Sequence, residues 1–138
     1  MEMAPDRGIP ILIRSKHASL AKALAENLAP EYDVVHICIT HHTSLYEIPS
    51  ILKGRLVTPF FTGSNLYRAP VVRRKPVAVV FDASISKHEI EDIKRLSEMT
   101  CQDVKFVMCQ KKDVLKCGFP VRRSIGRAMR KSLKEAGV

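Results

Sequence analysis

Apolar residues in this chain fall in short continuous runs, and these runs alternate with segments of helical spacing. The runs are rich in Val and Ile, which is typical of buried strands, and they cover residues 9–13, 32–39, 76–81 and 104–109. After the first run, Leu20, Leu24 and Leu28 recur every four residues and predict an amphipathic helix. Strands and helices that alternate in this way predict a parallel sheet with helices on both faces.

The second helix is predicted over residues 44–53, before Gly54. Ser44 and Glu47 match a capping box, in which each side chain satisfies a free backbone N–H at the start of a helix. Pro49 disfavours a helix interior, because proline has no N–H to donate. A helix that begins at Pro49 is therefore the alternative.

The last two helices also carry start signals. Ser86 and Glu89 match a second capping box, and Ile85 and Ile90 around it are placed as a hydrophobic staple. The closing helix is predicted over residues 120–137, because Pro120 suits the first position of a helix.

These elements predict a small three-layer α/β sandwich of the Rossmann-like or flavodoxin-like kind. Right-handed crossovers between parallel strands give a sheet of about four strands in the order 2-1-3-4. A chain of 138 residues is expected to form one domain over 1–138. Residues 55–75 show no period and predict a long loop, whose apolar side chains would pack on the domain or on a second copy in a homodimer.

Composition excludes several classes of protein. No run approaches the roughly 20 apolar residues of a membrane span, and the N-terminal apolar run is too short for a secretory signal. We therefore expect an intracellular protein, cytoplasmic or nuclear. The four cysteines form no C-x-x-C pair, which predicts reduced thiols and no metal site.

Polar residues gather where the predicted strands end. In an open α/β sheet the ligand binds at the carboxyl ends of the strands. The residues expected to bind a small molecule there are Ser15, Lys16, His17, Thr40 and Ser84. If the protein is an enzyme, His41 or His42 would transfer protons near neutral pH, with Asp82 as the group that orients the imidazole. The alternative is that these are loop residues whose side chains satisfy nearby backbone groups.

Two further residue patterns bear on the ligand. The segment 14–19 (RSKHAS) lacks the glycines of the G-x-G-x-x-G motif, which disfavours ordinary binding of NAD or FAD, since a Cβ blocks approach to the pyrophosphate. A single phosphate could still be held by Ser15, Lys16 and the helix N-terminus. His36 lies inside its strand and is interpreted as a packed or edge histidine rather than a ligand.

The closing helix concentrates positive charge. The formal net charge is +9, and residues 104–138 carry ten Lys or Arg against Asp113 and Glu135. An apolar stripe on one side of this helix predicts packing on the sheet. The opposite half is basic and carries Arg122, Arg123, Arg127, Arg130, Lys131 and Lys134. This face is either solvated or binds an anionic partner such as an acidic protein or nucleic acid.

The middle of the chain resembles a group of known proteins. Residues 47–49 (EIP), 63–67 (GSNLY) and 76–81 (PVAVVF) are similar to segments of small single-domain fungal proteins with a Rossmann-like fold. The resemblance covers about residues 9–110 and implies a fold without implying an activity. The sequence is therefore compatible with two functions. The first is a small-molecule binding domain, with or without a reaction, and the second is an interaction module that uses the basic helix.

Overall fold

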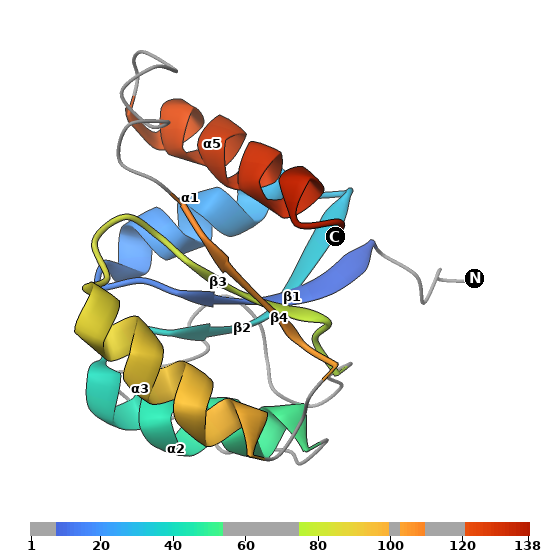
Figure 1. Ribbon diagram of the computed structural model, residues 1–138. Coiled ribbons are helices and arrows are strands. Elements are labelled where there is room, and N and C mark those ends of the chain that lie inside the picture. Colours follow the sequence, from blue (N-terminus) through green and yellow to red (C-terminus); the bar gives the residue numbers. More distant parts are fainter. Residues whose placement is uncertain (1–7, 54–74, 100–102, 110–120) are drawn as a thin grey trace.

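A four-stranded parallel sheet forms the centre of the computed structural model, which describes residues 8–53, 75–99, 103–109 and 121–138 (Figure 1). The strands are β1 (Ile9–Arg14), β2 (Tyr32–Cys38), β3 (Ala78–Phe81) and β4 (Lys105–Met108). Their order is β2-β1-β3-β4, and every neighbouring pair is parallel. The predicted fold class and strand order are confirmed.

In the described part of the chain, two helices cover each face of the sheet. Helices α1 (Ala18–Leu28) and α5 (Val121–Glu135) lie together on one face, and α2 (His41–Leu52) and α3 (Lys87–Glu98) lie together on the other (Figure 1). Alternation along a strand explains this arrangement, because successive side chains point to opposite faces. In β1, Ile11 and Ile13 belong to the core with α1 and α5, whereas Leu12 belongs to the core with α2 and α3.

Helix α2 begins earlier than its sequence predicts. The helix starts at His41, and the hydroxyl of Thr40 accepts a hydrogen bond from the backbone N–H of Thr43 at 3.1 Å as the N-cap. The predicted capping box of Ser44 and Glu47 is therefore wrong, and so is the alternative start at Pro49, which lies inside the helix. The hydroxyl of Ser44 instead donates to the carbonyl of Thr40 at 2.6 Å.

Helix α3 begins where its sequence predicts. The hydroxyl of Ser86 accepts from the N–H of Glu89 at 3.2 Å, and the Glu89 carboxylate accepts from the N–H of Ser86 at 3.3 Å. This capping box is confirmed, and it fixes α3 directly after the end of β3. The predicted loop over 55–75 lies outside the described residues except for Lys75. Within the described part of the chain, no helix is long and apolar enough to cross a membrane.

Candidate functional site

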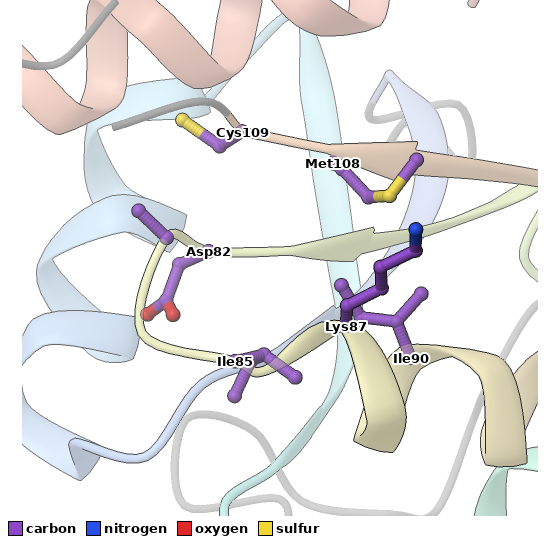
Figure 2. A pocket seen from close by; sticks show the side chains of 7 residues that line it. Asp82, Ile85, Lys87, Ile90, Met108 and Cys109 are labelled. Atoms are coloured by element: carbon purple, nitrogen blue, oxygen red, sulfur yellow. The ribbon is translucent and has the colours of Figure 1, made fainter. Parts of the chain in front are cut away.

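An open pocket of about 400 Å³ lies where β3 and β4 end and α3 begins (Figure 2). Its lining comes from three sequence segments that the fold brings to the carboxyl edge of the sheet. The lining residues are Asp82, Ala83, Ile85, Lys87, Ile90, Met108 and Cys109. Of these, the sequence analysis named Asp82 as a site residue, whereas Lys87, Met108 and Cys109 were not identified from sequence.

The walls of this pocket are apolar and its rim carries a positive charge. Ile85 and Ile90 are buried at its base, and the side chain of Met108 is 44% exposed. Figure 2 shows Lys87 reaching from the start of α3 toward Met108 on the same side of the pocket. The ammonium group of Lys87 has no ion-pair partner among the described residues.

Asp82 is held by its own turn rather than by a histidine. Its carboxylate oxygen Oδ1 accepts from the backbone N–H of Ser84 at 2.9 Å and from the Ser84 hydroxyl. The second oxygen, Oδ2, is buried and has no hydrogen-bond partner in the described part of the chain. Neither His41 nor His42 donates a hydrogen bond to Asp82, so the expected orientation of an imidazole by Asp82 is not seen in the described part of the chain.

The two histidines after β2 lie on the first turn of α2. His41 places Nε2 3.3 Å from the Asp92 carboxylate on α3, and Asp92 also pairs with His88 and Arg95. His42 is exposed. Neither His41 nor His42 lines the pocket, so the structure separates these two residues from Asp82. Their catalytic role stays a prediction.

The residues expected to bind a ligand after β1 and β2 make local contacts. Ser15 accepts from the backbone N–H of His17 at 3.2 Å, and Lys16 lies 3.6 Å from the carboxylate of Glu89. Thr40 caps α2. None of Ser15, Lys16, His17, Thr40 and Ser84 is among the pocket-lining residues.

Arg14 is a buried charge that the sequence analysis did not identify as part of this edge. Its Nη1 donates to the carbonyls of Ser15 at 2.8 Å and Ile39 at 2.9 Å, and its Nη2 lies 3.9 Å from Glu89. Burial lowers the pKa of Arg14, and the charge of Glu89 opposes this shift. Burial raises the pKa of Glu89, but hydrogen bonding from Ser86 and the charges of Lys16 and Arg14 outweigh it, so the net shift is downward. The ionised carboxylate of Glu89 is therefore stabilised by Ser86, Lys16 and Arg14.

The basic face of α5 is partly used inside the molecule. Arg130 lies 3.2 Å from the carboxylate of Glu31 and donates to the carbonyl of Asn27 at 2.6 Å. Lys134 also pairs with Glu31. Arg127 is exposed, and the side chains of Arg122 and Arg123 lie outside the described residues. Binding of an anionic macromolecule through this helix stays a prediction.

A second polar cluster is fully buried between β2 and α2. The Nε2 atom of His36 lies 2.8 Å from Oε1 of Glu47, and both side chains are 0% exposed. The thiol of Cys38 donates to the same carboxylate oxygen at 3.8 Å. Burial and the neighbouring Glu47 charge raise the pKa of the Cys38 thiol, so it is protonated at neutral pH. The prediction of His36 as a packed residue is confirmed, but its partners were not predicted.

Comparison with known proteins gives one distant relative. The chain is 27% identical to kojic acid related protein 6 of Aspergillus oryzae over 133 residues. The aligned region covers 95% of this chain and 77% of that protein. This relative is a fungal protein, which agrees with the resemblance of the sequence to fungal proteins. No family model matches the chain, and no solved structure matches it.

Proposed function

We propose that this protein binds a small, partly apolar anion in the pocket between β3, β4 and α3. The observation that carries the proposal is the ammonium group of Lys87, which has no ion-pair partner among the described residues, at the rim of a largely apolar pocket of about 400 Å³. Pockets that bind small molecules have volumes of roughly 300–1,000 Å³ and combine apolar walls with a few polar groups. This pocket has that composition, and the carboxyl edge of a parallel sheet is where such ligands bind.

Lys87 and the start of α3 favour a carboxylate or phosphate group on the side of the pocket away from the carboxylate of Asp82, whose Oδ1 is bonded to Ser84. Lys87 is the first residue of α3, and the N-terminus of a helix favours negative charge through its free N–H groups and its dipole. Glu89 lies on the same turn of α3 and carries a negative charge that would repel an anion. This charge is partly offset by the contacts of its carboxylate with Lys16 and Arg14. The apolar part of the ligand would contact Ile85, Ile90 and Met108.

The pocket supports binding more directly than catalysis. Among the described residues that line it there is no histidine, and the one carboxylate, that of Asp82, accepts two hydrogen bonds from Ser84. A proton-transfer role needs a side chain within hydrogen-bond reach of the reacting group. We therefore propose a binding function without assigning a reaction.

Matched pairs of small probes test this proposal by NMR. Benzoate and benzyl phosphate are titrated beside neutral benzyl alcohol, and the backbone amide shifts of Ile85, Lys87 and Met108 are followed. We expect saturable shifts at these amides with the anions and weaker binding of the alcohol. Lys87→Met, which keeps the apolar stem, should weaken anion binding by about tenfold, which is ~1.4 kcal/mol.

Lys53→Met is the matched control, because Lys53 is an exposed lysine at the C-terminal end of α2, away from the pocket. This variant should bind the anions as the native protein does. If benzoate shifts no pocket amide, or if Lys87→Met and Lys53→Met bind it equally well, the proposed function is wrong.

A further inference from the structure

We propose that His36, Cys38 and Glu47 form a buried binding site for a divalent transition-metal ion, with zinc as the ion that best matches the three ligands. This site lies between β2 and α2 and is separate from the pocket, whose lining includes none of the three residues. An imidazole nitrogen, a thiolate sulfur and a carboxylate oxygen are the protein ligands that zinc takes.

The fold brings the three ligand atoms together from two elements. His36 and Cys38 are two residues apart on β2, so their side chains share the face that α2 covers. Glu47 lies on α2, opposite both of them. One ligand atom from each residue can be chosen so that all three lie within 4.8 Å of one another.

Two of the three separations between ligand atoms are close to those of a tetrahedral zinc site. With zinc bonds of about 2.0–2.3 Å, neighbouring ligand atoms lie roughly 3.2–3.7 Å apart. The observed separations are 2.8 Å from His36 Nε2 to Glu47 Oε1 and 3.8 Å from Cys38 Sγ to the same oxygen. Shifts of a few tenths of an ångström would therefore bring both separations to Glu47 to the values of a zinc site, and the third, between His36 and Cys38, is at most 4.8 Å.

Burial and charge balance point the same way. Buried ionisable groups are generally paired or coordinate metals, because an isolated charge is costly to remove from water. A divalent ion between a thiolate and a carboxylate gives a neutral group, with the imidazole as a neutral ligand. Binding would displace the proton of the Cys38 thiol to solvent and require the lone pair of His36 Nε2, so the ring proton would reside on Nδ1.

Cobalt is the probe that reports this site directly, because a cobalt–thiolate bond has a charge-transfer absorption in the near ultraviolet. The test protein has Cys101, Cys109 and Cys117 replaced by serine, so that Cys38 is its only thiol. Because the site is buried, Co²⁺ is added during refolding under reducing conditions. We expect the absorption band to saturate at one equivalent of Co²⁺ and to disappear when Zn²⁺ is added.

Two variants in this background identify the ligands. Cys38→Ser should abolish the band, and Glu47→Gln should weaken cobalt affinity by more than about 100-fold, since loss of outer-shell partners alone costs 10–100-fold. Lys87→Met is the control and should leave cobalt binding unchanged, which separates this test from that of the pocket. Circular dichroism checks that each variant folds, and if Cys38→Ser does not, Glu47→Gln in the native sequence gives the deciding comparison.

The proposal is overturned if the Cys38-only protein gives no band at stoichiometric cobalt, or if Glu47→Gln binds cobalt as tightly as its parent. Thermal melting provides a second readout. Zinc at saturation should raise the melting temperature of the native sequence, because an ion that binds the folded state alone stabilises it. The same zinc should leave the melting temperature of Glu47→Gln unchanged.

Discussion

The guanidinium of Arg14 donates a hydrogen bond at 2.9 Å to the backbone carbonyl of Ile39, and this contact joins the carboxyl end of β1 to the carboxyl end of β2. The same nitrogen also donates to the carbonyl of Ser15 at 2.8 Å. Arg14 is 1% exposed, so these bonds form in a largely water-free environment. The edge of the sheet where the strands end is therefore organised by a buried cation.

Replacing Arg14 with methionine should destabilise the fold. The substitution keeps an apolar stem of similar shape but leaves the carbonyls of Ser15 and Ile39 without this donor, and each unsatisfied buried group costs about 1–3 kcal/mol. We expect the free energy of unfolding, measured by urea denaturation, to fall by at least 1–3 kcal/mol. Lys22→Met on the exposed face of α1 is the control and should change it little. Equal stability of the two variants would show that the Arg14 contacts are not needed.

The N-cap of α2 gives a second prediction. Removing the Thr40 hydroxyl by Thr40→Ala deprives the backbone N–H of Thr43 of its acceptor, and such cap losses cost about 0.5–2 kcal/mol. Thr40→Ser retains the oxygen and should keep most of the stability. Thermal or chemical denaturation of the two variants makes the comparison, and a Thr40→Ala protein as stable as Thr40→Ser would contradict the assigned cap.

The fold was predictable because hydrophobic periodicity reflects local geometry. The apolar runs gave the four strands, and the order followed from the handedness of crossovers. The Ser86–Glu89 capping box was also correct, since both partners lie within one turn. Such signals depend on neighbours in the sequence and need no knowledge of tertiary contacts.

The errors arose where a distant partner decides the role of a side chain. Glu47 has the spacing of a capping residue, but its carboxylate instead pairs in the core with His36 and Cys38 on β2. The helix begins at His41, with Thr40 as its N-cap. The sequence places the candidate site at the carboxyl edge of the sheet, and a pocket at that edge has Asp82 in its lining, but its use as a binding site stays a prediction. The sequence did not identify Lys87 and Met108 as site residues, because they come together only through the tertiary arrangement of α3 and β4.

A glycine before the first strand supports a third prediction. Gly8 has a φ of +110°, and a Cβ added there would lie 2.2 Å from the carbonyl oxygen of Pro30. Gly8→Ala therefore introduces both an unfavourable backbone conformation and a backbone clash, and should lower the free energy of unfolding by more than about 1 kcal/mol. Gly137→Ala is a useful comparison, because Gly137 also has a positive φ but the nearest atom to its added Cβ is the flexible Lys105 ammonium. Urea denaturation should show the larger loss for Gly8→Ala.

Glu31 links the turn before β2 to the last helix, and its ion pairs make stability depend on pH. Hydrogen bonding from Lys134 is the main cause that lowers the pKa of Glu31 from its ordinary value of 4.5, and the charges of Lys134 and Arg130 add to it. A carboxyl group whose pKa is depressed in the folded state contributes stability above its unfolded pKa. That contribution is lost as the pH falls through the lower folded value.

Glu31→Gln should therefore be less stable than the native protein at pH 7, and the difference between them should shrink as the pH is lowered below 4.5. The side chains are partly exposed, so added salt should also reduce the difference at pH 7. Urea denaturation across this pH range, at low and high salt, makes the measurement. Glu26→Gln on the exposed face of α1 controls for removal of one negative charge and should show no such dependence. A stability difference between Glu31→Gln and the native protein that persists unchanged at acid pH would show that Glu31 acts through packing rather than through its charge.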